Sequence, residues 1–219
     1  MITDELKKRI LSSIILLPLI FFIIVKGSYY LNVFLILCLL VAIFEWVSMV
    51  KLNLHKLLGI IFIIISFISI YKIRNSLNGE YFYLLFITMI CVATDLGGFL
   101  FGKIIKGPKL TKLSPNKTYS GMIGSFILTI IFVYLFSISN FFENTYYLTI
   151  EIIIFSVGLS AVSQLGDICV SYFKRSSKIK DTGHIIPGHG GLLDRIDGMI
   201  FAYPFSYIFI LTTNITFFQ

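Results

Sequence analysis

The residues best suited to chemistry lie near the C-terminal end, in the stretch GHGGLLDRIDG at 188–198. Three glycines fall within four residues, and two aspartates flank an arginine. The stretch separates two apolar segments of a 219-residue chain that is 57% hydrophobic. Carboxylates and a guanidinium have little reason to be there unless they bind something. The candidates are a metal ion, a phosphate or one another.

The residues just before this stretch add positive charge. Four cations fall within seven residues, followed by an aspartate: Lys174, Arg175, Lys178, Lys180 and Asp181. Glycine accepts positive φ, so consecutive backbone NH groups can converge on a phosphate. Arginine offers phosphate a bidentate fork and lysine a point charge. The loop 174–198 therefore predicts a phosphate site, although no G-K-[ST] follows the glycines as in a Walker A loop.

A fourth aspartate lies in an apolar segment upstream. The polar positions of that segment are spaced by 4, 3, 4, 4 and 3 residues: Ser156, Ser160, Ser163, Asp167, Ser171 and Lys174. This spacing puts them on one face of a helix. Serines there indicate close helix packing, but a carboxylate at membrane depth is costly and usually functional. Asp167 and Asp194 could supply the one or two carboxylates that Mg²⁺ takes, although an Asp–Arg ladder closing the loop would account for one aspartate.

Another apolar segment repeats this pattern, with Cys91, Asp95, Gly98 and Gly102 at helical spacing. The glycines predict a close-packing face, and Asp95 is a second carboxylate near the same membrane boundary. For Glu45 and Glu151, which also lie in apolar segments, we expect side chains that reach out to the membrane surface.

The polar loop 103–121 contains five lysines and no acid. Lys117 and Thr118 precede the next apolar segment, and NH groups at a helix start beside a lysine suit an anion. A loop that only sets membrane topology explains the lysines equally well.

Composition places these motifs in a membrane protein, because only 13% of residues are charged. We predict an all-α integral membrane protein, a single domain over 1–219, with two polar cytoplasmic loops and about seven spans: 10–25, 28–50, 54–71, 81–102, 119–139, 147–173 and 198–218. With seven spans, the 18 Lys and Arg residues divide 15 to 3, only Lys26, Lys72 and Arg74 lying on the far side. The positive-inside rule then puts the N-terminus and both loops in the cytoplasm.

Residues 171–197, SYFKRSSKIKDTGHIIPGHGGLLDRID, resemble the signature of the phosphatidate cytidylyltransferases, or CDP-diacylglycerol synthases. That pattern runs Ser, Lys-Arg, Lys-Asp, a small residue, Pro, His-Gly-Gly and Asp-Arg-x-Asp. The matching positions are Ser171, Lys174, Arg175, Lys180, Asp181, Gly183, Pro187, His189, Gly190, Gly191, Asp194, Arg195 and Asp197. SQLGD (163–167), DLGGFLFGK (95–103) and SPNKTYSG (114–121) also resemble segments of the family, so the family-like catalytic core is 81–210.

The resemblance implies that CTP and phosphatidate give CDP-diacylglycerol and pyrophosphate, a step of phospholipid biosynthesis in the cell membrane. The lipid phosphate would attack the α-phosphate of CTP. Its second pKa of about 6 leaves it largely ionised, so no general base is needed. Mg²⁺ is the implied cofactor, with one or two ions and a contribution of K⁺ left open. A homodimer is expected by analogy, and no nucleic-acid partner is expected.

The resemblance also implies roles for individual residues. Asp167 and Asp194 would be metal ligands, and Asp197 and Asp95 are further candidates for binding the metal or supporting its ligands. The triphosphate or lipid phosphate would be held by Lys174, Arg175, Lys180 and Arg195, with Lys117 from the other loop. Gly190 and Gly191 would let a phosphate approach, and His189 would orient a carboxylate or phosphate. Ser171 and Asp181 complete the substrate-binding set.

Two other functions remain open at the level of sequence. A CTP-dependent lipid-alcohol kinase shares parts of this layout, but its hydroxyl acceptor favours a nearby base. A small transporter would use Asp95 and Asp167 as an ion path and would leave the cationic, glycine-rich loop without a role.

Overall fold

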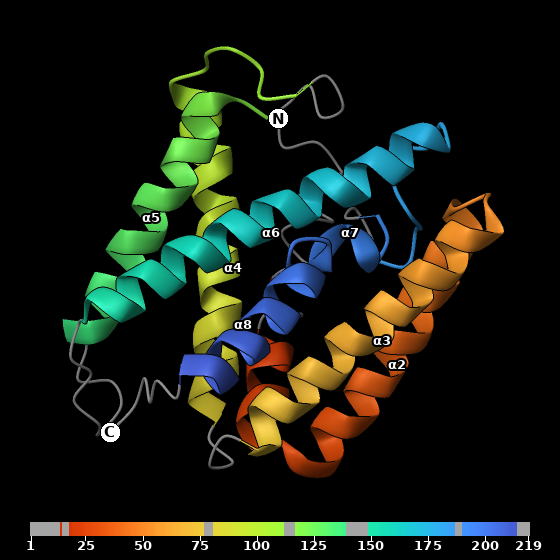
Figure 1. Ribbon diagram of the computed structural model, residues 1–219, viewed down its shortest axis with the longest axis horizontal. Coiled ribbons are helices and arrows are strands. Elements are labelled where there is room, and N and C mark those ends of the chain that lie inside the picture. Colours follow the sequence, from red (N-terminus) through yellow and green to blue (C-terminus); the bar gives the residue numbers. More distant parts are fainter. Residues whose placement is uncertain are drawn as a thin grey trace. The chain divides into compact units, whose positions relative to one another are not determined.

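The computed structural model describes residue 14 and residues 18–76, 81–111, 117–138, 149–186 and 190–213. Within those ranges the regular elements are helices (Figure 1), besides isolated bridges between Lys109 and Thr118 and between Ile186 and Gly190. The helices are α2 (Ser28–Met49), α3 (Asn53–Ser76), α4 (Tyr81–Ile104), α5 (Tyr119–Ile138), α6 (Ile150–Ser176), α7 (Leu193–Ile196) and α8 (Met199–Thr213).

Among the described residues, five helices, α2 to α6, are long and apolar enough to cross a membrane. They correspond to five of the seven predicted spans. The first predicted span, 10–25, lies partly outside the described residues, among which residues 18–26 are helical. Helix α8 has 15 residues, fewer than the roughly 20 that a span needs, and the end of its predicted span also lies outside the described part. The all-helical membrane class is confirmed, and the number seven stays a prediction.

By internal contacts the chain divides into two compact units. The first comprises Met1–Leu85 and Phe173–Asp197, and the second comprises Phe86–Tyr172 and Gly198–Gln219. Helix α6 begins in the second unit and ends in the first. The predicted single domain over 1–219, with its catalytic core at 81–210, stays a prediction.

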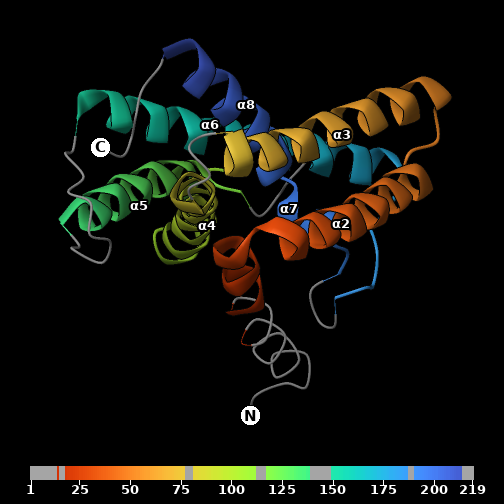
Figure 2. The ribbon, with the colours of Figure 1, turned by 90° about the horizontal axis from the view of Figure 1, so that it is seen from below.

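In the first unit, α2 and α3 lie side by side (Figures 1 and 2). The two helices pack closely at Gly59. A Cβ at this position would come 2.0 Å from the Trp46 indole, so only glycine leaves room for that ring. The indole Nε1 donates a hydrogen bond to the His55 carbonyl at 3.2 Å, and the ring packs edge-on against Phe173. These contacts hold the end of α2 in place.

Helix α3 is longer than predicted. The apolar segment ends at residue 71, but the helix continues to Ser76 and includes Lys72 and Arg74. Arg74 is only 9% exposed, and its guanidinium donates to the carbonyls of Ile24 and Val25 at 3.2 and 3.4 Å. These carbonyls belong to the last turn of the helical segment 18–26. Gly27, with φ 59°, follows the segment and separates it from α2, which runs in a different direction (Figure 2). Arg74, which follows the predicted span 54–71, therefore lies within a helix and binds the orphan carbonyls of a neighbouring helix end.

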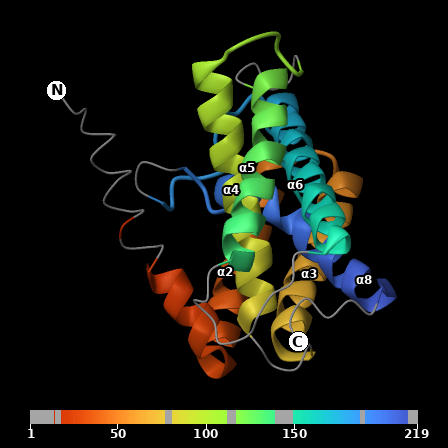
Figure 3. The same cartoon turned by 90° about the vertical axis from the view of Figure 1, so that its left-hand side faces the viewer.

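In the second unit, α4 and α5 lie side by side (Figure 3). The predicted glycine face is confirmed. A Cβ at Gly98 would come 3.0 Å from the Ser125 hydroxyl, and one at Gly102 would come 3.2 Å from that of Thr118. Gly97 packs still closer, since a Cβ there would lie 2.5 Å from the Gly124 carbonyl oxygen.

The predicted serine face of α6 is also confirmed as a buried packing face. Ser156, Ser160 and Ser163 are each at most 1% exposed. Ser160 receives a hydrogen bond from Thr94 of α4 at 2.9 Å. A Cβ at Gly198 would come 2.4 Å from the Ser163 hydroxyl, so a small residue is needed there. Small and hydroxyl side chains thus let these helices pack closely.

Candidate active site

Lys117 is positioned by a short antiparallel contact ahead of α5. The backbone NH of Leu110 donates to the Lys117 carbonyl at 2.8 Å, and that of Tyr119 donates to Pro108 at 3.1 Å. The Thr118 hydroxyl then accepts the NH of Gly121 at 3.1 Å, which satisfies one of the free donors at the start of α5. Lys117 is therefore presented just before a helix start, as predicted, on a backbone held from both sides.

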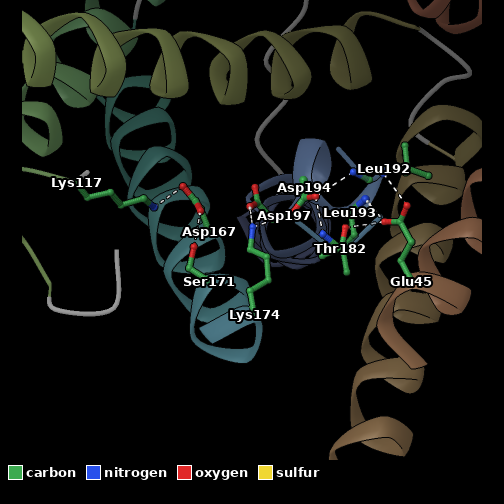
Figure 4. A network of polar contacts seen from close by, with 11 residues as sticks. Glu45, Lys117, Asp167, Ser171, Lys174, Thr182, Leu192, Leu193, Asp194 and Asp197 are labelled. Atoms are coloured by element: carbon green, nitrogen blue, oxygen red, sulfur yellow. Dashed lines mark hydrogen bonds and ion pairs between the residues drawn. The ribbon is translucent and has the colours of Figure 1, made fainter. Parts of the chain in front are cut away.

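Asp167 forms an ion pair with Lys117 (Figure 4). Ser171, one turn further along α6, donates a hydrogen bond to the other oxygen of the same carboxylate at 3.3 Å. The side chains of Lys117 and Asp167 are 23% and 30% exposed, so the pair remains accessible to solvent. Lys117, Asp167 and Ser171, which we call the Asp167 cluster, are thus three predicted site residues that the structure brings together within the second unit.

A second group forms in the first unit around Lys174 near the end of α6 (Figure 4). The Lys174 ammonium donates to Asp194 Oδ1 at 2.9 Å and lies 3.8 Å from Asp197 Oδ2. The side chains of the lysine and the two aspartates are 12%, 5% and 15% exposed. We call these three residues the Lys174 cluster. All three are predicted site residues, and here two carboxylates converge on one cationic group.

The second oxygen of Asp194 is held by the backbone. The NH groups of Thr182 and Gly191 donate to Oδ2 at 2.7 and 3.0 Å. Burial alone would raise the pKa of Asp194, but the Lys174 ammonium and these two NH groups outweigh it and hold the pKa below its ordinary value of 3.8. Asp194 is therefore an ionised carboxylate at neutral pH, in a fixed orientation.

Glu45 of α2 joins the same loop, and here the sequence prediction was wrong. Its side chain does not reach the membrane surface, because the residue is only 2% exposed. Its carboxylate accepts hydrogen bonds from the Thr182 hydroxyl at 2.9 Å and from the NH groups of Leu192 and Leu193 at 2.9 and 2.8 Å (Figure 4). The sequence held one signal for this, a carboxylate in an apolar segment, but nothing that named its partners.

The glycines of the loop allow close approach, and the groups that approach are carboxylates of this chain. Gly190 has φ 86°, and a Cβ there would come 2.9 Å from Asp194 Oδ2. A Cβ at Gly191 would come 2.6 Å from Glu45 Oε2. The positive φ expected of this turn is confirmed at Gly190, whereas the approach of a phosphate to Gly190 and Gly191 stays a prediction.

The remaining predicted site residues lie on the surface of their elements or outside the described part. The exposed ones are Asp95, Arg175, Lys180, Asp181 and Arg195. His189 lies outside the described residues. Exposure suits side chains that meet a charged substrate from solution.

A sequence model of the cytidylyltransferase family matches residues 7–78 and 54–213. The chain belongs to this family. A phosphatidate cytidylyltransferase of Rickettsia bellii (strain RML369-C) is 36% identical over 217 residues, covering 93% of this chain and 90% of that protein. The one of Rickettsia conorii (strain ATCC VR-613 / Malish 7) is 38% identical over 205 residues, covering 88% and 85%. The one of Bacillus subtilis (strain 168) is 33% identical over 154 residues, covering 70% and 56%. The family match includes both clusters and Glu45.

The Lys174 cluster offers the better place for a metal ion. Asp194 Oδ1 and Asp197 Oδ2 already converge on a cationic atom, and Mg²⁺ usually takes one or two carboxylates, with water and phosphates completing its coordination. Among the described residues, no group of three or more His, Cys, Asp or Glu side chains gathers. Two carboxylates in the first unit thus fit a Mg²⁺ ion shared with a phosphate. The joint role of Asp167 and Asp194 as ligands stays a prediction, since they belong to different units.

Proposed function

We propose that this protein is a phosphatidate cytidylyltransferase, which makes CDP-diacylglycerol and pyrophosphate from CTP and phosphatidate. The observation that carries the proposal is the Lys174 cluster, in which a lysine with a side chain only 12% exposed contacts two aspartates inside the signature-like segment of a cytidylyltransferase-family chain. The names of the relatives from Rickettsia and Bacillus support the choice of phosphatidate as acceptor.

In this reaction an oxygen of the lipid phosphate attacks the α-phosphorus of CTP. A new P–O bond forms, the bond from the α-phosphorus to the bridging oxygen breaks, and pyrophosphate leaves with that electron pair. The attacking phosphate is already ionised at neutral pH, so the chain need not supply a base. The main barrier is repulsion between two anions, and fixed positive charge lowers it.

We assign that charge to Lys174, Lys117 and the exposed cations Arg175, Lys180 and Arg195. Lys174 is held by Asp194 and Asp197, so its ammonium is oriented before substrate arrives. Lys117 is held in the same way by Asp167. Exposed arginine and lysine side chains suit capture of the triphosphate, since they bind phosphate oxygens at little desolvation cost.

We further propose that Asp194 and Asp197 hold Mg²⁺. When bound, the ion would supply neutralisation of the charge that develops on pyrophosphate. The role of this chain is to keep Asp194 ionised and aimed. Two backbone NH groups and Lys174 stabilise the ionised carboxylate and fix its orientation. They leave one lone pair of Oδ1 available to bind the ion.

The same proposal puts the protein in the cell membrane with its polar loops 103–121 and 174–198 facing the cytoplasm. The charge imbalance of 15 to 3 between the two predicted sides supports this orientation. Phosphatidate would then reach the site from the bilayer and CTP from the cytosol. A homodimer is part of the proposal by analogy with the family only.

Pyrophosphate release by detergent-purified protein tests the proposal. CTP, phosphatidate and Mg²⁺ are supplied together, EDTA provides the blank, and a dolichol-type alcohol replaces phosphatidate in a parallel reaction. We expect metal-dependent release with phosphatidate and no phosphoryl transfer to the alcohol. Transfer to the alcohol without pyrophosphate release would instead identify a lipid kinase that uses the same phosphate site.

A further inference from the structure

Glu45 is a buried carboxylate for which the reaction described above has no use. It lies on α2, and its hydrogen-bond donors lie on the signature-like loop 137 to 148 residues away. Two donors are consecutive backbone NH groups, those of Leu192 and Leu193, and the third is the Thr182 hydroxyl. A carboxyl group is buried without a large cost only when it has such hydrogen-bond donors, so α2 and the loop depend on each other.

The loop needs an outside acceptor because α7 cannot stabilise itself. It has four residues, and Leu192 at its N-cap makes no side-chain cap hydrogen bond. A helix this short is unstable alone, and its first NH groups have no partner within the helix. The Glu45 carboxylate takes the NH groups of Leu192 and Leu193, as a capping side chain would. A residue on a different helix therefore fixes the start of α7.

Glu45 and Asp194 accept hydrogen bonds from the same two parts of the loop, Thr182 and residues 191–193. Thr182 gives its NH to Asp194 and its hydroxyl to Glu45. Gly191 gives its NH to Asp194, and the next two NH groups go to Glu45. Any shift of Glu45 would therefore move the two NH groups that orient Asp194.

The loop is also shaped around this carboxylate. A Cβ at Gly183 would come 2.7 Å from Glu45 Oε1, and one at Gly191 would come 2.6 Å from Oε2. Two glycines on separate parts of the loop thus leave space for the same side chain.

We infer that Glu45 is a positioning residue for cytidylyl transfer, which holds Asp194 in its reactive orientation through Thr182, Leu192 and Leu193. This inference rests on the proposed function for its link to the reaction. The link between Glu45 and the loop is a property of the fold and is tested separately.

The test is Glu45→Gln, with two measurements on the full-length protein in detergent. Glutamine keeps the size and one acceptor oxygen, but its NH₂ group faces donors that it cannot satisfy. By hydrogen exchange, we expect the amides of Leu192 and Leu193 to exchange about tenfold faster, because they lose an acceptor. By pyrophosphate release, we expect kcat to fall about tenfold or more while KM for CTP stays within about threefold, because orientation and not capture is lost.

Two variants control for general damage. Arg74→Gln removes another buried charge that binds backbone groups in the same unit, so it should lower thermal stability without changing loop exchange or kcat. Ser48→Ala, on the exposed side of α2 one turn from Glu45, should change neither.

Unchanged loop exchange in Glu45→Gln would overturn the inference, as would unchanged kcat or an equal loss of kcat in Arg74→Gln. If the wild-type protein released no pyrophosphate, the proposed function would fail, and hydrogen exchange would still show whether Glu45 holds the loop. The two failures are therefore distinguishable.

Discussion

The Lys174 ammonium lies 2.9 Å from Asp194 Oδ1, although 20 residues separate them in sequence. Their side chains are 12% and 5% exposed, so little water could solvate either charge in the absence of its partner. Removing one partner of such a pair leaves the other charge buried, which costs far more than loss of a surface ion pair. Asp197 lies 3.8 Å from the same ammonium and shares this dependence.

Lys174→Met should therefore lower kcat/KM strongly, by about 100-fold or more, a loss comparable to that of one preorganised electrostatic donor. Methionine keeps the apolar stem but leaves Asp194 and Asp197 without their shared cation. Pyrophosphate release measures the loss. Lys178→Asn is the matched control, because Lys178 is an exposed cation of the same loop with φ 59°, a conformation that asparagine accepts. Equal losses in the two variants would show that only the net charge of the loop matters.

The depressed pKa of Asp194 predicts how stability depends on pH. Its folded-state pKa lies below the ordinary 3.8, so its contribution is complete above that value and is lost as pH falls through the folded-state pKa. In thermal unfolding with EDTA, the free energy of unfolding of Asp194→Asn should lie below that of the wild-type protein by a constant amount between about pH 5 and pH 8. In this range the pKa values of Asp194 in the folded and the unfolded state both lie well below the pH. The deficit should shrink below the ordinary value of 3.8. A deficit that grew on acidification would mean that Asp194 is stabilised in its protonated form.

Helical spacing alone was enough to predict the packing faces of α4 and α6. Their glycines and serines repeat every three or four residues, and the structure buries the serines and sets the glycines against α5. Glu45 escaped this reasoning because its partners are two backbone NH groups and a hydroxyl more than 130 residues away. Backbone donors have no residue type, so a sequence pattern does not reveal them. The partners of Arg74 escaped it for the same reason, since they are the backbone carbonyls of Ile24 and Val25.

The Asp167 cluster predicts an effect on substrate binding and little effect on stability. The Lys117–Asp167 pair is partly exposed, and such pairs contribute only about 0–1 kcal/mol to folding. Lys117→Ala should therefore leave the unfolding temperature nearly unchanged and raise KM for CTP or phosphatidate. Steady-state kinetics with each substrate varied in turn provide the measurement. Lys103→Ala, an exposed cation at the end of α4, provides the control. Unchanged KM values in Lys117→Ala would assign this loop to membrane topology alone.

The close contact between α4 and α5 predicts that replacing Gly97 by alanine lowers the unfolding temperature, whereas the same change at Gly158 does not. A Cβ at Gly97 would meet the Gly124 carbonyl oxygen at 2.5 Å and the Ser125 Cα at 2.8 Å, and backbone atoms cannot move aside cheaply. Overpacking of this kind costs about 1–3 kcal/mol, whereas alanine in place of glycine within a helix gains about 1 kcal/mol. Gly97→Ala should therefore lower the unfolding temperature. At Gly158 of α6, a Cβ would lie 3.4 Å from the Phe205 ring edge, an ordinary contact, so Gly158→Ala should be neutral or stabilising. Thermal unfolding of both variants in one detergent compares them directly, and equal unfolding temperatures would mean that α4 and α5 can separate without loss.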